Sequence, residues 1–422
     1  MQQLLQYAPQ PWNLKAGQKW HVFLSYRSVH RPWVIQLYDI LHQLKFEVFL
    51  DQYILSASDD LVTKLSEGLR MSGAGILIWS KAAADSKWCQ KEHSSMVSRE
   101  TKDPNFHYVI AKLDEGDIPE LEGGKIYQDF SGHREGPCGV DLLHLLHGLE
   151  GNPLPPGAVK FAVEVDKEFK STIQAIKAAQ EINDARELLR LSELKSPAWT
   201  FSAVLPCLVA DGLLKLGRND DALTVLNRAE EAFPDSIRPK QLKGLALRRK
   251  GDWRAALSVL SKLKAAGEMD PETLGIYAAA WVDQYKAEKN ELYLRTSRDL
   301  YAQAFLNAPL DYYVGINAAS KSVLLGELEP GKQYAAQVEQ IVGDKPKPND
   351  YWMTATVAEV QLLKGDYAKA ADLYKAAVAT EPHARGSHKS TWDQARSLMD
   401  KLQTPPADRA KIEAVFKHLT PP

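Results

Sequence analysis

One short segment of the sequence combines residue types that could do chemistry. Residues 86–92 read SKWCQKE, and they follow closely on the apolar run 75–80, which predicts a strand. In an α/β fold, ligands bind where strands end and the following helices begin. Glu92 stands one helical turn after Trp88, so both side chains can share one helix face. Glu92 is therefore a candidate catalytic residue, and the alternative is a solvated helix glutamate beside Lys91.

The elements that would position Glu92 alternate between strand and helix patterns. Apolar runs predict buried strands at 21–26, 46–51, 74–79, 106–111 and, more weakly, 126–127. Helical spacing predicts helices at 34–44, about 59–71, 85–100 and 140–149. Short strands that alternate with helices are typical of a parallel, doubly wound sheet. We expect this α/β domain at 19–150, after an irregular arm at 1–18.

A break follows at 151–157, where seven residues include three prolines and two glycines. We place the domain boundary there, because only helical patterns follow. Gly217 and Gly251 each open a similar segment, and the two are 34 residues apart, which is the tetratricopeptide (TPR) period. A third such segment begins at Gly365, out of register. Residues 158–422 are thus expected to form an all-α, TPR-like repeat domain, and the alternative is an ordinary helical bundle.

The composition excludes several classes of partner. The 422 residues carry a net charge of −2, so no strong field favours nucleic acid or an anionic membrane. The basic run 240–250 lacks interleaved aromatic residues and is expected to be a solvated helix face. The three cysteines lie far apart and predict neither a disulfide framework nor a metal site. Without a signal peptide or an apolar run of about 20 residues, we expect a cytoplasmic protein.

The first 150 residues resemble a TIR domain. Three segments carry the resemblance in order and spacing: 22–27 (VFLSYR), 48–51 (VFLD) and 86–92. The resemblance implies a flavodoxin-like fold with a parallel five-stranded sheet. The residues after Asp51 correspond to the family's BB loop. They lack the Pro-Gly pair common in animal receptor-adaptor TIR domains, and this favours the bacterial, enzymatic branch.

Enzymatic TIR domains cleave NAD+ between nicotinamide and ribose, and the resemblance gives the catalytic role to Glu92. Cleavage of an N-glycosidic bond builds positive charge on the ribose, which a carboxylate can stabilise. The products would be nicotinamide and ADP-ribose or a cyclic ADP-ribose isomer. NAD+ is expected as a substrate and no cofactor is expected, since the sequence has neither a Rossmann GxGxxG fingerprint nor a phosphate-binding loop.

The resemblance also implies substrate-binding residues. Tyr26, Arg27 and Ser28 follow the first strand, where the family's pocket lies, and an arginine can hold a pyrophosphate through its forked donors. The alternative for Arg27 is a surface residue, and Ser28 replaces a second arginine of some relatives. Asp51 either contacts substrate or caps its loop. Trp88 either walls the nicotinamide pocket or anchors its helix to the sheet.

Partners are implied as well. Enzymatic TIR sites are often completed between two copies through the BB loop, where Tyr53, Ile54 and Leu55 are expected to mediate self-association. Residues 312–319 and 351–356 resemble the regulatory, TRAF-binding segment of apoptosis-signal-regulating kinases, so a protein partner on the helical repeats is expected. One hypothesis is thus an NAD+ hydrolase or cyclase of antiviral defence, regulated by the helical region. The other is a non-enzymatic TIR–TPR adaptor.

Overall fold

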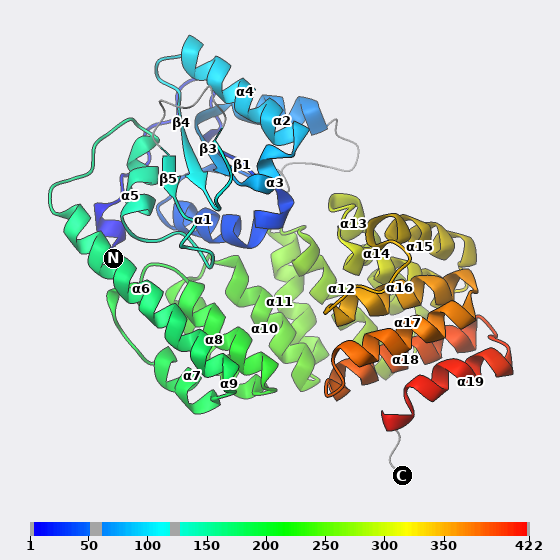
Figure 1. Cartoon of the computed structure of the whole chain (residues 1–422). Helices are drawn as coiled ribbons and strands as arrows, with labels where there is room; N and C mark the ends of the chain where they lie inside the picture. Colours follow the sequence, from blue (N-terminus) through cyan, green and yellow to red (C-terminus); the bar gives the residue numbers. More distant parts are fainter. Residues whose placement is uncertain (1–3, 51–60, 119–126, 420–422) are drawn as a thin grey trace. The chain divides into compact units, whose positions relative to one another are not determined.

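The computed structural model describes residues 4–50, 61–118 and 127–419 (Figure 1). The chain divides into two compact units, Met1–Asp252 and Trp253–Pro422. The first unit holds the whole sheet together with the helices up to α10. The second unit is entirely helical in its described residues.

The sheet of the first unit has five parallel strands in the order β2-β1-β3-β4-β5. The strands are β1 Trp20–Ser25, β2 Val48–Phe49, β3 Ser72–Trp79, β4 His107–Lys112 and β5 Tyr127–Asp129. The parallel five-stranded sheet expected from the apolar runs is thereby confirmed. Because the chain reverses its direction of winding between β1 and β3, the carboxyl ends of these two strands flank the crevice where such sheets bind ligands.

Helices cover both faces of the sheet. They are α1 Arg31–Gln43, α2 Leu61–Arg70, α3 Lys81–Ala84, α4 Lys87–Lys102 and α5 Gly139–Gly148. Alternation along β1 sends Phe23 into a core with residues of α2 and α4, while Val22 and Leu24 face α1 and α5. Figure 1 shows α2 and α4 on one side of the strands and α1 and α5 on the other. The carboxyl edge of the sheet is therefore held between two packed layers.

The helix expected at 85–100 begins two residues later, and a short helix precedes it. The Ser80 side chain accepts a hydrogen bond from the Ala83 N–H (3.1 Å) and caps α3. The Ser86 side chain accepts one from the Cys89 N–H (3.3 Å) and caps α4. Two serine caps divide this stretch, because each one satisfies a backbone donor that a new helix leaves unpaired.

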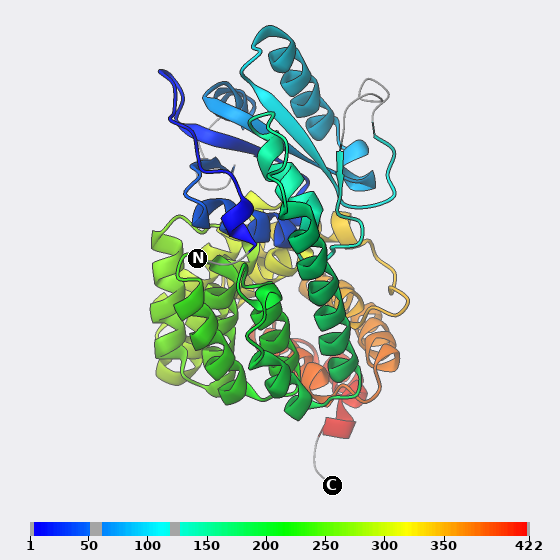
Figure 2. The same ribbon diagram turned by 90° about the vertical axis from the view of Figure 1, so that its left-hand side faces the viewer.

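Five further helices belong to the first unit. They are α6 Ala158–Glu181, α7 Ala185–Ser192, α8 Val204–Lys215, α9 Asn219–Ala232 and α10 Ile237–Lys250. One apolar core runs from Leu4 through α1 and α5 into these helices, which Figure 2 shows as a row of green ribbons. The Asp39 carboxylate of α1 accepts a hydrogen bond from the Ile237 N–H at the start of α10 (3.3 Å). The domain boundary at 151–157 remains a prediction. In the structure, residues before and after this segment belong to the same apolar core.

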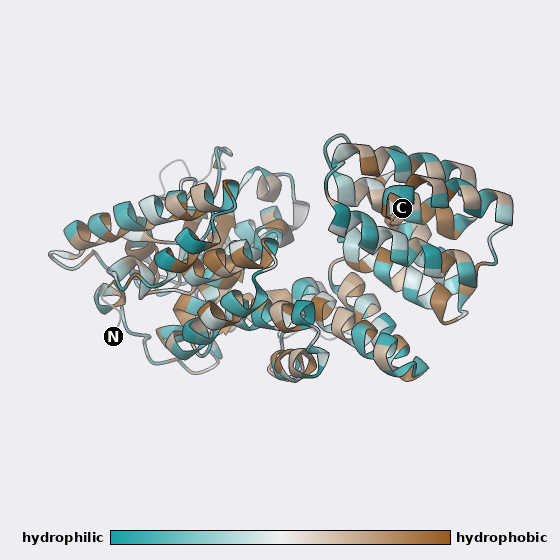
Figure 3. Ribbon diagram, turned by 90° about the horizontal axis from the view of Figure 1, so that it is seen from below, coloured by the Kyte–Doolittle hydropathy of each residue, from teal (hydrophilic) through white to brown (hydrophobic). Residues whose placement is uncertain are grey.

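The second unit consists of helices in its described residues. Its helices are α11 Trp253–Ala265, α12 Pro271–Glu288, α13 Glu291–Asn307, α14 Tyr312–Leu324, α15 Leu328–Val342, α16 Tyr351–Lys364, α17 Tyr367–Thr380, α18 Arg385–Lys401 and α19 Pro406–Val415. Figure 3 shows hydrophilic and hydrophobic residues mixed along the helices of both units. Across the described part of the chain, no helix has the length and apolar character needed to cross a membrane.

The repeated glycines end helices, as the 34-residue spacing suggests. Gly217, Gly251 and Gly365 have φ angles of 72°, 89° and 87°, a region that only glycine enters without strain. After Gly251, the Asp252 N–H bonds to the Leu247 carbonyl (3.0 Å), which satisfies a carbonyl at the end of α10. The glycine thus ends α10 within one residue.

Candidate functional site

Glu92 lies beside the carboxyl end of β1. It is on the second turn of α4 and is 9% exposed, so it does not belong to a solvated helix face. Ser25, the last residue of β1, is 1% exposed and donates its hydroxyl hydrogen to Glu92 Oε2 at 2.7 Å. A buried carboxylate needs such donors to remain ionised. The structure therefore holds Glu92 in one place, where β1 ends.

The positive charge of Arg27 acts on Cys89, which lies one helical turn before Glu92. Burial raises the pKa of the Cys89 thiol, Glu92 adds to this increase, and Arg27 opposes it. Cys89 lies one turn before Glu92 and is fully buried, so both charged groups act on one enclosed point. The Arg27 Nε atom is buried and has no hydrogen-bond partner among the described residues. A guanidinium with a buried free donor is suited to hold a ligand with an anionic group.

Two polar residues bridge the crevice between β1 and β3. His30, in the 3₁₀ turn Ser28–His30, shares a hydrogen bond of 2.6 Å between its Nε2 and the Ser80 Oγ. Ser80 directly follows β3. Burial lowers the pKa of His30, and the negative charge of Asp114 opposes this effect. Both oxygens of Asp114 in turn accept the Lys81 N–H at 3.1 Å. These contacts fix the loops that follow β1, β3 and β4 relative to one another.

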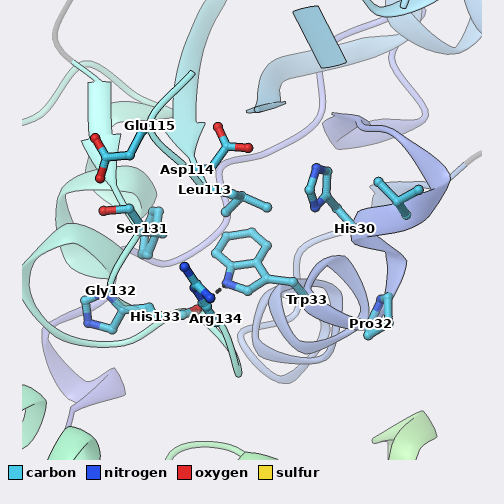
Figure 4. Close-up of a pocket in the computed structure, with 12 residues that line it drawn as sticks. His30, Pro32, Trp33, Leu113, Asp114, Glu115, Ser131, Gly132, His133 and Arg134 are labelled. Atoms are coloured by element: carbon cyan, nitrogen blue, oxygen red, sulfur yellow. Dashed lines mark hydrogen bonds between the residues drawn. The ribbon is translucent and has the colours of Figure 1, made fainter. Parts of the chain in front are cut away.

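A cavity of about 540 Å³ opens next to this bridge (Figure 4). Its volume lies in the range of small-molecule pockets. The residues that line it are Val29, His30, Pro32, Trp33, Leu113, Asp114, Glu115, Phe130, Ser131, Gly132, His133 and Arg134. Trp33 and Phe130 pack edge to face as an apolar floor, while Asp114, Glu115 and Arg134 contribute charge to the lining. The cavity thus offers an aromatic surface together with both signs of charge.

The helical part of the first unit holds one wall of this cavity. The Trp33 Nε1–H donates to the His133 carbonyl at 2.9 Å, the contact drawn as a dashed line in Figure 4. The His133 ring bonds to Asp166 of α6, and Asp166 also pairs with Lys170 at 2.9 Å. Glu135 pairs with Lys177 of the same helix. A shift of α6 would therefore act directly on the loop that follows β5.

The structure places only some of the expected site residues. It places Glu92 beside Ser25 at the end of β1, the charges of Glu92 and Arg27 both act on Cys89, and the Tyr26 hydroxyl accepts a hydrogen bond from Arg31 Nη1 (2.7 Å). Ser28 begins the 3₁₀ turn and Trp88 lies in the first turn of α4, but their side chains are outside the described residues. Asp51, Tyr53, Ile54 and Leu55 are also outside them. The roles expected for these residues remain predictions.

Sequence reasoning missed three residues of this edge: Ser25, His30 and Ser80. A usable signal existed, since Ser25 and Ser80 stand at the ends of apolar strand runs and His30 follows the first run within a few residues. In a sheet whose winding reverses between the first and third strands, residues that follow these two strands meet at the crevice. Trp33 of α1 is buried and also lines the cavity.

Comparison with known proteins agrees with this arrangement. A family model described as TIR domain matches residues 22–143. A second, described as Tetratricopeptide Repeats-Sensor, matches residues 213–325. A curated relative, the NAD(+) hydrolase TcpA of Theionarchaea archaeon (strain DG-70-1), is 29% identical over 91 residues. That match covers 21% of this chain and 28% of the relative's length.

Solved TPR structures resemble the helical part. A thermophilic TPR protein of Thermus thermophilus is 19% identical, with a TM-score of 0.37 over 47% of this chain and 97% of that one. MamA of Desulfovibrio magneticus RS-1 is 16% identical, with a TM-score of 0.34 over 41% of this chain and 94% of its own. With the sheet order and the glycine turns described above, the two family matches identify the parts of the molecule. Residues 22–143 form a TIR domain, and residues 213–325 form a tetratricopeptide-repeat sensor region.

Proposed function

We propose that the TIR domain cleaves NAD+ and releases nicotinamide. The observation that carries this proposal is the buried Glu92 carboxylate, held by Ser25 at 2.7 Å at the carboxyl edge of the sheet. The distant relative named as an NAD(+) hydrolase supports the same activity. A TIR domain that acted only as an adaptor would have no use for a carboxylate enclosed at this edge.

In the proposed reaction, the main contribution of the protein is to stabilise the positive charge that develops on the ribose. The bond between the ribose C1′ and the nicotinamide nitrogen breaks, and its electron pair leaves with nicotinamide, which becomes neutral. Positive charge then develops on the ribose, where the Glu92 carboxylate stabilises it. Attack by water at C1′, with loss of a proton, gives ADP-ribose. Attack by a nitrogen of the substrate's own adenine gives a cyclic isomer.

The neighbouring residues would bind the rest of the substrate. Arg27, with its buried free Nε, is proposed to contact the pyrophosphate. Tyr26, Ser28 and Asp51 are proposed to line the pocket beside it. Trp88, one turn before Glu92, is proposed to stack on the nicotinamide ring, as an aromatic face can.

Assembly and regulation complete the proposal. Tyr53, Ile54 and Leu55 of the BB loop are proposed to dock on a second TIR copy and so switch activity on. The helical region is proposed to control this step through a protein partner, as the resemblance of 312–319 and 351–356 to kinase regulatory segments suggests. We propose a role in bacterial antiviral defence, in which loss of NAD+ or a released cyclic product acts as the signal.

The test is nicotinamide release by the purified full chain, followed by chromatography at several protein concentrations. We expect release by the wild type and none by Glu92→Gln, which preserves size and removes the charge. Glu164→Gln is the matched control, because Glu164 is exposed on α6. If the wild type releases no nicotinamide at any concentration, or Glu92→Gln retains full turnover, the enzyme proposal is wrong. The adaptor hypothesis then takes its place.

A further inference from the structure

Ser25 stands where the apolar inner face of β1 ends. Its side chain shares the side of the strand that carries Phe23, and its backbone is paired in register with Leu77 of β3. Phe23, Leu77 and Cys89 all belong to the core beneath α4. A hydroxyl buried in such surroundings costs free energy unless it finds a partner. Its partner is the carboxylate of Glu92, 67 positions later in the chain.

The two ends of this hydrogen bond are held independently. Ser25 belongs to a strand between two parallel neighbours, so its backbone is fixed by the sheet. Glu92 belongs to α4, whose first turn is capped by Ser86. A hydrogen bond between two fixed backbones restricts the carboxylate to one orientation. Reacting groups gain rate from such preorganisation, because no ordering is needed as the reaction proceeds.

The direction of the bond matters as well. The hydroxyl is the donor and Oε2 is the acceptor, so the interaction favours the ionised form of the carboxylate. Burial acts in the opposite direction, and an ionised carboxylate is the form that stabilises a positive ribose. One buried hydroxyl thus orients the carboxylate and also favours its ionised form.

We propose that Ser25 is a positioning residue for NAD+ cleavage, which holds the Glu92 carboxylate in one orientation at the carboxyl end of β1. This inference rests on the proposed function. Ser25 acts through Glu92 and not on the substrate, so its loss should reduce turnover much more than substrate binding.

The sharpest variants are Ser25→Thr and Ser25→Val. Threonine and valine have nearly the same shape, and both suit a strand, but only threonine has a hydroxyl. We expect Ser25→Thr to keep at least half of the wild-type kcat. Ser25→Val should lose about tenfold or more in kcat, with KM changed less than about threefold. The pH at which activity falls on the acid side should move upward in Ser25→Val, since one donor to the ionised carboxylate is missing.

Ser72→Ala is the matched control. The Ser72 hydroxyl is also fully buried, at the opposite end of β3, where it donates to the Gly68 carbonyl at 2.8 Å. Its loss should cost similar stability and leave kcat and the acid limb unchanged. Thermal unfolding of Ser25→Thr and Ser25→Val, measured side by side, shows whether either variant is poorly folded. In that case kcat is calculated per folded molecule, and the ratio of the two kcat values still measures the effect of the hydroxyl.

The outcomes separate the two proposals. A wild type without nicotinamide release overturns the proposed function and this inference with it. An active wild type with equal kcat and equal pH profiles in Ser25→Thr and Ser25→Val overturns the role of Ser25 alone, and Glu92 keeps its role. Equal losses in both variants without a shifted acid limb mark Ser25 as a structural residue, which also overturns the inference.

Discussion

Replacement of Asp39 by asparagine should make the first unit more stable at neutral and higher pH. Asp39 lies on α1, is 8% exposed and caps the start of α10 through the Ile237 N–H. Burial raises its pKa to about 7, although hydrogen bonds from Ser236 and Ile237 and the charge of Lys240 oppose the increase. The negative charge of Asp235 adds to it. Asparagine keeps an acceptor oxygen and carries no charge.

The magnitude follows from proton linkage. The carboxyl has a pKa of about 7 in the folded unit against 3.8 in the unfolded chain. Between these values the folded state binds the proton that the unfolded state releases, so the free energy of unfolding falls as pH rises. Below pH 3.8 none of this stability is lost, because both states are protonated, and above pH 7 the loss is complete, because both are ionised. From pH 5 to pH 8 this one group removes ~2–3 kcal/mol, at 1.36 kcal/mol for each unit of pKa difference.

The assay is urea unfolding of the full chain from pH 5 to pH 8, followed by far-UV circular dichroism. We expect the free energy of unfolding of the wild type to fall by ~2–3 kcal/mol more than that of Asp39→Asn across this range. Glu164→Gln, an exposed change on α6, should follow the wild type. Parallel curves for the wild type and Asp39→Asn, or a variant less stable than the wild type at pH 8, would show that the buried carboxylate is fully compensated and would refute the reasoning.

Four further predictions concern activity and organisation. Glu92→Ala should abolish NAD+ cleavage without unfolding the TIR domain, and a folded variant with wild-type turnover would exclude Glu92 as catalytic. Asp166→Asn should loosen the loop after β5 by weakening its contacts with His133 and Lys170, seen as faster amide exchange at 130–136; unchanged exchange would contradict this. Specific activity should rise with protein concentration, and Tyr53→Asp or Leu55→Asp should lower activity and assembly together; constant activity on dilution of a monomer would count against self-association. Limited proteolysis should cut first at 151–157, and an earlier cut within 160–400 would argue against that boundary.

Much of the architecture could be predicted because its signals are local. Apolar runs mark the strands of the sheet, since a strand buried on both faces is apolar throughout. Gly217 and Gly251 mark helix ends, because the chain needs a positive φ angle there. Helix boundaries were less accurate: α4 begins at Lys87 and not at 85, since either Asp85 or Ser86 could cap a helix and only Ser86 does so.

The sequence by itself determined the kind of domain, the repeat period and Glu92 as the candidate catalytic residue. Only the tertiary structure decided what surrounds Glu92. Its partner Ser25 is 67 residues away, and His30 meets Ser80 across 50 residues. The order of the strands makes these pairs neighbours, and strand order depends on how all the layers pack together. The packing of layers also decided the core that joins α1 to α6–α10. The apolar face of a helix can be recognised in the sequence, but the sequence does not show which other element covers that face.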